Sequence, residues 1–206
     1  MTMNKAINLY LTILRDKKTK CLQFRHAATI VADLLAHQTL LQLNTKTVTI
    51  DTPLAKTSGI QRINDIVLIP ILRSGITMLP AFLCYFPDAP IGVVGLKREE
   101  KTAEAHLYYH NFPPLTPEHQ IIILDPMLAT GGTAVETIAL LKKYGIQENK
   151  IIFVSIVSAP EGINKIRTAF PTVTIITAAE DERLNAKKFI VPGLGDFGDR
   201  YFGTEE

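Results

Sequence analysis

The sequence predicts an α/β fold with a doubly wound, mainly parallel five-stranded sheet and helices on both faces. Short apolar runs, each suited to a strand covered on both faces, recur along the chain. Helical patterns separate most of these runs, which is the alternation typical of parallel sheets. The chain has 206 residues, of which 47% are hydrophobic. This is enough for one large core, so we expect a single domain over residues 1–206.

The N-terminal quarter of the chain predicts two helices and one strand. Residues 5–15 carry a weak helical pattern, and residues 22–43 carry a stronger one with apolar side chains every three or four positions. Residues 45–52 alternate polar and apolar side chains, which is typical of a half-exposed strand, and Pro53 ends it.

Five buried strands are predicted in the remainder, at residues 66–72, 91–96, 121–125, 151–157 and 173–177. Helices are predicted between them at residues 76–85, 133–144 and 161–170, the first of these bent at Pro80. Pro70 lies inside the first strand, where it is tolerated only near the strand end.

Two further segments are expected to lie outside the sheet core. Residues 97–119 are polar and fit a long excursion or a two-stranded arm. The tail from residue 180 is rich in glycine and irregular. With the N-terminal helices, residues 97–119 and the tail are predicted to form a small hood or arm beside the sheet.

The stretch of residues 121–133 organises the rest of the chain. An apolar run ends in Asp125, a turn with Gly131 and Gly132 follows, and an amphipathic run begins at Thr133. Free amides at a helix N-terminus bind anions, so this pattern indicates a phosphate-binding loop. An ordinary turn capped by Thr130 or Thr133 would show the same pattern, and on this stretch alone both interpretations stay open.

Ligands of such sheets bind beyond the carboxyl ends of the strands, where the winding reverses. Arg73 and Asp125 follow two of the predicted strands. If these strands are neighbours, Arg73 faces the loop across a shared crevice.

Several function classes are disfavoured. The net charge of +2 argues against a nucleic-acid partner, and no apolar run is long enough to span a membrane. With no convincing signal peptide, we expect a cytoplasmic protein. Residues 193–198 match a dinucleotide fingerprint but open no βαβ unit, and the five histidines show no metal-ligand spacing.

What remains is a site for anions and hydroxyl groups. The loop supplies amides for one phosphate, Arg73 and Arg98 supply charge for further phosphate, and Asp125 and Asp196 suit hydroxyls or Mg²⁺. These groups indicate a phosphate ester of a sugar that carries a second phosphate group.

Three motifs resemble the uracil phosphoribosyltransferase family. They are residues 125–133 (DPMLATGGT), residues 70–75 (PILRSG) and residues 192–200 (PGLGDFGDR), the last followed by Phe202-Gly203-Thr204. The resemblance runs from about Lys20 to Thr204. It implies transfer of ribose 5-phosphate from phosphoribosyl diphosphate (PRPP) to uracil, giving UMP and diphosphate.

The resemblance also implies a role for each residue of the site. The residues expected to bind PRPP are Arg73, Arg98, Asp125, Pro126, Met127, Leu128, Ala129, Thr130, Gly131, Gly132, Thr133 and Asp196. Main-chain groups of Ile190, Gly195, Asp196 and Phe197 are expected to bind uracil. Mg²⁺ would enter with PRPP, and no direct protein ligand of the metal is assigned.

Three departures from the family pattern bear on these roles. Pro126 follows Asp125 where many phosphoribosyltransferases have a second acid, and the uracil branch shares this feature. Phe197 replaces the usual alanine, so its ring either points away from the base or narrows the base pocket. Residues 102–106 differ from the usual arm.

Two alternatives to the enzyme stay open at this point. One is a regulatory protein on the same fold that senses sugar diphosphate or nucleotide and binds RNA. The other is a non-catalytic relative kept for interaction. The family further implies a homodimer or tetramer, with GTP as an effector in some members.

Overall fold

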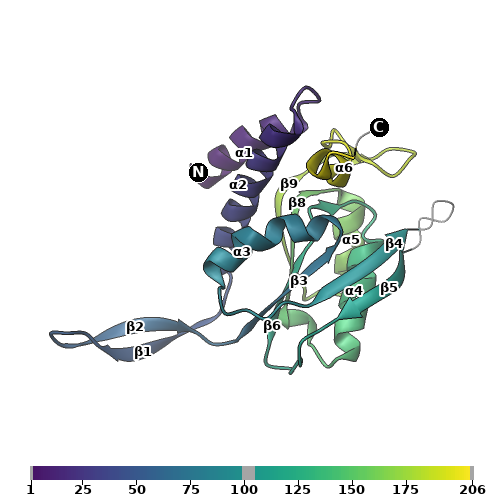
Figure 1. The fold of residues 1–206 in the computed structure, drawn as a ribbon. Helices are drawn as coiled ribbons and strands as arrows, with labels where there is room; N and C mark the ends of the chain where they lie inside the picture. The colour runs from purple at the N-terminus through teal and green to yellow at the C-terminus, as the bar shows by residue number, and fades with distance from the viewer. Residues whose placement is uncertain (1, 99–104, 205–206) are drawn as a thin grey trace.

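The computed structural model describes residues 2–98 and 105–204 (Figure 1). At its centre all five predicted strands are present and pair in parallel. In spatial order they are β4 (Val93–Arg98), β3 (Ile66–Leu72), β6 (Gln120–Leu124), β8 (Ile151–Ser158) and β9 (Thr174–Glu180). Within the described residues, β5 (Ala105–Asn111) and β7 (Met127–Leu128) widen the sheet to seven strands. The predicted fold class is confirmed, in a sheet larger than expected.

The winding of the sheet reverses between β3 and β6. The chain passes from β3 to β4 on one side, then returns to β6 on the other side of β3 and continues outward to β8 and β9. Val67 pairs with Ile121 and Ile69 with Ile123, so the two strands whose ends carry Arg73 and Asp125 are direct neighbours, as predicted. Pro70 pairs with Leu124 at the end of this ladder, where its missing amide interrupts no central pairing.

Helices cover both faces of the sheet because its strands are apolar on both faces. Ile122 and Leu124 of β6 belong to a core shared with α2 (Cys21–Leu40) and α3 (Leu79–Tyr85). Ile121 and Ile123 face the opposite core, formed with α4 (Gly132–Lys143) and α5 (Pro160–Ala169). The continuous apolar run seen in the sequence therefore reports two buried faces. None of the helices in the described ranges could cross a membrane.

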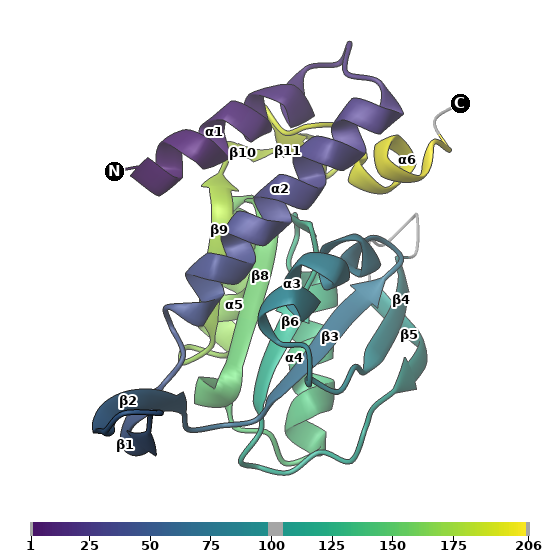
Figure 2. The same ribbon diagram turned by 60° about the vertical axis from the view of Figure 1, so that its left-hand side comes forward.

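A hood lies beyond the carboxyl ends of the strands (Figure 2). It consists of α1 (Thr2–Arg15), the start of α2, the short hairpin β10 (Arg183–Leu184) and β11 (Ile190–Val191), and α6 (Phe197–Phe202). The N-terminal helices and the tail were both expected here. The tail is more regular than its glycine content suggested.

Within the described part of residues 97–119, the two strands of the predicted excursion are present. β4 runs into it and β5 returns antiparallel to β4, at the edge of the sheet. The sequence of residues 102–106 differs from the usual arm of the family. Residues 102–104 and the side chain of Ala105 lie outside the part of the chain that the structure describes.

The strand expected at residues 45–52 is present as β1 (Thr45–Asp51), but the expected half-burial is wrong. It pairs with β2 (Lys56–Arg62), which was not predicted, and the two-stranded ribbon projects away from the sheet (Figure 1). Almost every residue of both strands is exposed. Alternation in the sequence fits a half-buried strand, but among the described residues the ribbon is covered mainly at its base, where Arg62 of β2 contacts Phe86 and Asp88.

The helix expected at residues 76–85 is present, but as two successive helices and not as one helix bent at Pro80. A 3₁₀ helix, η1 (Ser74–Met78), leads directly into α3, and Pro80 lies in the first turn of α3. The missing amide of a proline costs no intrahelical bond there, so Pro80 helps α3 to begin instead of bending it. A second short 3₁₀ helix, η2 (Glu148–Lys150), precedes β8.

Candidate active site

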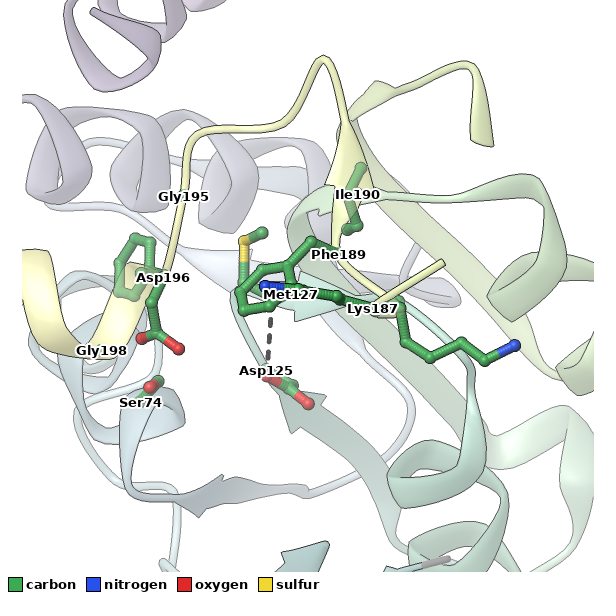
Figure 3. A pocket seen from close by; sticks show the side chains of 12 residues that line it. Ser74, Asp125, Met127, Lys187, Phe189, Ile190, Gly195, Asp196 and Gly198 are labelled. Atoms are coloured by element: carbon green, nitrogen blue, oxygen red, sulfur yellow. Dashed lines mark hydrogen bonds between the residues drawn. The ribbon is translucent and has the colours of Figure 1, made fainter. Parts of the chain in front are cut away.

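Two adjoining cavities open at the reversal point, beneath the hood. The larger, of about 700 Å³, is lined by Arg73, Asp125, Thr133 and Asp196, among others. The smaller, of about 260 Å³, shares Ser74, Asp125, Asp196 and Gly198 with it. Figure 3 shows Ser74 and Asp196 on one side of the smaller cavity, Ile190 on the other, and Asp125 between them. The two cavities therefore form one continuous site.

Asp125 lies where β6 breaks its pairing. β6 pairs with β8 up to Leu124, and β7 resumes pairing with β8 at Met127. Between these points the carbonyl of Pro126 accepts from the amides of Ile156 and Val157. The Asp125 carboxylate accepts from the Met127 amide at 3.3 Å and is half-buried. The regular strand pairing is thus interrupted for two residues, although both still bond to β8, and Asp125 lines both cavities at this irregularity.

The predicted anion loop follows at once and is built by close backbone packing. Gly131 has a φ of 75°, and a Cβ there would lie 2.9 Å from the carbonyl oxygen of Gly162. A Cβ on Gly162 would lie 2.6 Å from the carbonyl oxygen of Ala129. Glycine is therefore required on both sides of the contact between the loop and α5.

The loop leaves donors for a ligand. The first hydrogen bond of α4 runs from the Val135 amide to the Gly131 carbonyl, so the amides of Gly132 and Thr133 precede it. The buried Oγ1 of Thr130 has no hydrogen-bond partner among the described residues. A buried hydroxyl without a partner is rare and fits a missing acceptor such as a phosphate oxygen. The structure favours the anion site over a simple capped turn, because neither Thr130 nor Thr133 caps α4.

The other loop residues divide between the cavity and the core. Ala129 and Met127 line the smaller cavity, whereas the side chain of Leu128 packs in the core with α4 and α5. Pro126 is buried.

Arg73 approaches the site from β3. The turn after it presses on β6, since a Cβ on Gly75 would lie 2.2 Å from the carbonyl oxygen of Leu124. The Arg73 side chain is mostly exposed, with Nη2 3.5 Å from Oδ1 of Asp199 in α6. The expected shared crevice with Asp125 is confirmed by their common cavity. The backbone of Arg98 belongs to β4, but its side chain lies outside the described part of the structure.

Asp196 enters from the tail as the N-cap of α6, where its Oδ1 accepts from the Asp199 amide at 2.9 Å. Gly195 before it has a φ of 82°, and Gly198 after it lies against the start of η1. A Cβ on Gly198 would lie 2.9 Å from Oγ of Ser74. The glycines of residues 193–198 thus serve close approach and turning and not dinucleotide binding.

The ring of Phe197 points away from the site. It is 1% exposed and packs edge-on against Phe24 of α2, with ring centroids 5.3 Å apart, and stacks on Tyr201 at 5.8 Å. Of the two interpretations offered by the sequence, the structure favours a core ring. The main chain of Phe197 is then what faces the smaller cavity, beside the buried Ile190.

An ion pair that the sequence did not reveal holds the tail at Gly193, two residues before Gly195. Arg15, the last residue of α1, donates to both carboxylate oxygens of Asp181 at 2.5 and 2.8 Å. The Gly193 amide donates to Asp181 at 2.7 Å and the Gly193 carbonyl accepts from Arg15 at 2.9 Å. Hydrogen bonding to Asp181 raises the pKa of Arg15. In the sequence, the only signal for this ion pair was the acidic residue Asp181 directly after the strand β9.

Other lining residues were also missed. Lys187, Lys188 and Phe189 border the smaller cavity, although the lysines resembled an ordinary solvated face. Asn185 shapes their turn, since its Oδ1 accepts from the amides of Lys187 and Phe189. Asparagine favours turns, so Asn185 is a signal that could have located this hairpin.

No group of three or more metal-ligating side chains occurs in the described ranges. Asp125 and Asp196 nevertheless both line the larger cavity. Mg²⁺ commonly keeps several waters and takes one or two carboxylates plus ligand phosphates. The site therefore fits a cation that arrives with an anionic ligand.

Comparison with known proteins covers nearly the whole chain. A sequence profile described as "Uracil phosphoribosyltransferase" matches residues 1–204. Curated proteins of that name from Limosilactobacillus fermentum and Mycoplasma genitalium are 43% and 45% identical, over 95% of this chain and 93% and 94% of theirs.

Solved structures agree on the fold. The AQ2163 protein from Aquifex aeolicus superposes with a TM-score of 0.87 at 33% identity, covering 97% of this chain and 95% of that one. Adenine phosphoribosyl transferase from Trypanosoma brucei, at 14% identity, matches with a TM-score of 0.55 over 85% of this chain and 71% of that one. The second likeness concerns the fold alone.

Proposed function

The chain belongs to the uracil phosphoribosyltransferase family, and we propose that it makes UMP and diphosphate from uracil and PRPP, a reaction of pyrimidine salvage. One structural observation carries the proposal. An anion loop, two carboxylates and a narrower chamber meet in one continuous site at the strand reversal. The described residues offer groups suited to the phosphate, the sugar and the base of the two substrates. This favours an enzyme over an RNA-binding regulator or a non-catalytic relative.

The loop and Asp125 would hold the sugar phosphate. We assign the 5-phosphate to the amides of residues 129–133, supported by the amides that precede the first bond of α4 and by the buried Thr130 hydroxyl. Asp125 would accept hydrogen bonds from the 2- and 3-hydroxyls of the ribose. Its position at the junction of both cavities supports this role, because the ribose links the phosphate to the base.

Arg73 and Arg98 would bind the diphosphate. Arg73 lines the larger cavity, and its side chain is 63% exposed, so a ligand can reach the guanidinium. Guanidinium groups suit phosphate because they stay charged and bond in pairs. Asp196 would bind PRPP, directly or through Mg²⁺ entering with it. The cation would supply positive charge to the departing diphosphate.

Uracil would occupy the smaller cavity. Main-chain groups of Ile190, Gly195, Asp196 and Phe197 would read its edge, which presents an acceptor, a donor and an acceptor. Cytosine inverts two of these groups and would leave buried main-chain groups facing the wrong partner. The buried Phe197 ring supports reading by the main chain, because the side chain is committed to the core.

The chemistry follows from this placement. Breaking the bond to diphosphate develops oxocarbenium character at the anomeric carbon. Arg73 and Arg98 stabilise the leaving group, while the loop and Asp125 keep the sugar where N1 of uracil can attack that carbon. The N1–C1 bond forms as the bond to diphosphate breaks, and the N1 proton passes to water or to the departing diphosphate. No covalent enzyme intermediate is needed.

We further propose that the chain is a single phosphoribosyltransferase domain, that it is cytoplasmic, and that it forms a homodimer or tetramer. The projecting β1–β2 ribbon supports assembly, because it exposes Leu54 at 98% and Ile60 at 78%. Light scattering would test the assembly. Adding GTP to the activity assay would test its role as an effector.

The central test is direct. Purified protein is incubated with PRPP, Mg²⁺ and labelled uracil, with labelled cytosine in a parallel reaction. We expect UMP from uracil and little or no product from cytosine. Failure to form UMP with a folded protein would overturn the proposal.

A further inference from the structure

A β-bulge re-aims one tyrosine at the edge of the sheet. Along the β4–β5 ladder Gly95 pairs with Tyr109 and Leu96 pairs with Leu107, so Tyr108 is an extra residue on β5. An extra residue bends its strand and changes the direction of its side chain. Bulges of this kind are over-represented next to active sites.

The ring of Tyr108 lies over the backbone of Gly95. A Cβ on Gly95 would lie 2.5 Å from Cζ and 2.8 Å from the hydroxyl oxygen of Tyr108. Gly95 is buried, whereas Tyr108 is 64% exposed. The ring therefore covers the strand with one face and leaves much of its surface open.

This position is one strand away from Arg73. Gly95 pairs in parallel with Leu72 of β3, and Arg73 follows Leu72 directly. Neighbouring strands lie about 4.8 Å apart. Tyr108 and Lys97 line the larger cavity together with Arg73, Asp125 and Asp196. Tyr108 thus borders the part of the cavity assigned to the diphosphate.

We propose that Tyr108 is a diphosphate-binding residue, donating its phenolic hydroxyl to a phosphate oxygen of PRPP or of the diphosphate product. The inference rests on the proposed function and adds a neutral donor to the arginines already assigned. A phenol donates one directed hydrogen bond and adds no charge. It can hold the leaving group while allowing it to depart.

The bulge explains why the regular pattern of β5 hides this role. In an uninterrupted strand neighbouring side chains point to opposite faces, and nothing in the sequence distinguishes Tyr108 from Tyr109. Tyr109 does not line either cavity described above. The pair therefore provides a test residue and a matched control.

The test compares two ligands in Tyr108→Phe. Calorimetry with diphosphate and Mg²⁺ probes the proposed contact with Tyr108. Calorimetry with UMP probes the smaller cavity and the phosphate loop, because UMP lacks the diphosphate that would make this contact. We expect diphosphate to bind about tenfold more weakly, as for one hydrogen bond to a charged group, with UMP binding unchanged. Tyr109→Phe should leave both affinities unchanged.

Gly95→Ala supplies a second, independent perturbation, because the new methyl group displaces the Tyr108 ring. It should weaken diphosphate binding in the native background and add little in Tyr108→Phe. The inference is wrong if Tyr108→Phe binds diphosphate normally, or if Tyr109→Phe weakens it equally. Wild-type UMP formation, measured alongside, separates such a failure from failure of the proposed function itself.

Discussion

Replacing Asp181 with asparagine tests how the tail segment that we propose to read uracil is held in place. Asp181 accepts from both Nη atoms of Arg15 and from the Gly193 amide, and Arg15 also donates to the Gly193 carbonyl. Both polar groups of Gly193 are therefore clamped, two residues before Gly195. Asparagine keeps the shape but presents an uncharged amide to the guanidinium.

The size of the effect follows from burial. The Asp181 side chain is 4% exposed and that of Arg15 is 27% exposed. Breaking a buried ion pair by removing one partner costs about 3–5 kcal/mol. Because water reaches part of Arg15 and asparagine can still accept from Gly193, we expect a loss of about 2–3 kcal/mol. Urea unfolding with the slope held in common measures it.

The kinetic effect of Asp181→Asn distinguishes a specific role in positioning Gly193 from a general contribution to the stability of the fold. If the ion pair holds Gly193 in place for uracil, its loss should raise the KM for uracil about tenfold while the KM for PRPP changes little, since the proposed phosphate loop lies on other elements. Such a change corresponds to about 1.4 kcal/mol of lost base binding. Steady-state UMP formation with each substrate varied in turn provides the measurement.

Two further variants separate the loss of this ion pair from the loss of a charge and from poor folding. Glu182→Gln removes a neighbouring ion pair with Arg183, in which both side chains are at least 65% exposed, and should cost less than about 0.5 kcal/mol. If Asp181→Asn folds poorly, Arg15→Lys keeps the charge and loses the paired hydrogen bonds. A folded variant of either kind with an unchanged KM for uracil would refute the reasoning, as would an equal rise in the KM for PRPP.

Four further changes test the rest of the site. Asp125→Ala should lower kcat/KM at least about a hundredfold with the fold intact, since two hydrogen bonds to a charged group contribute about 3 kcal/mol; unchanged turnover, with the fold checked by circular dichroism, would contradict its role at the ribose hydroxyls. Arg73→Ala should weaken calorimetric binding of diphosphate about tenfold and leave UMP binding nearly unchanged; the reverse order would move Arg73 out of the diphosphate subsite. Phe197→Leu should lower the free energy of unfolding by about 1–2 kcal/mol without altering the preference among 5-substituted uracils, because the ring lies in the core; an altered preference in competition assays would place the ring at the base. The hydrogen bond from the Leu184 amide lowers the pKa of Glu161, so its stabilisation is present above the ordinary carboxyl pKa and is lost as the pH falls below about 4; the stability difference between native protein and Glu161→Gln should vanish there in acid titrations, and a difference that grows in acid would exclude this contact as its source.

Much of the fold could be predicted because burial leaves a periodic record in the sequence. Strands β3, β6 and β8 are apolar along their whole length and were located within one residue or two. Where burial was absent the same reasoning failed. β1 alternates like a half-buried strand yet is exposed on both faces, and its partner β2 shows no apolar period at all.

The candidate site divides in the same way. Asp125, the Gly131-Gly132 turn and Asp196 were located in the sequence, because turn residues at strand ends are local signals. Arg15 and Asp181 were not, since 166 positions separate the two side chains and neither has a local pattern that names the other.

The sequence by itself determined the strand–helix alternation, the anion loop and the family motifs, since these depend on the conformations and burial of neighbouring residues. The tertiary structure decided which segments meet: β3 beside β6, the Phe197 ring in the core, the clamp on Gly193, and the bulge that turns Tyr108 over Gly95. The physical reason is that long-range pairing and packing depend on the path of the whole chain, and a local pattern does not record that path.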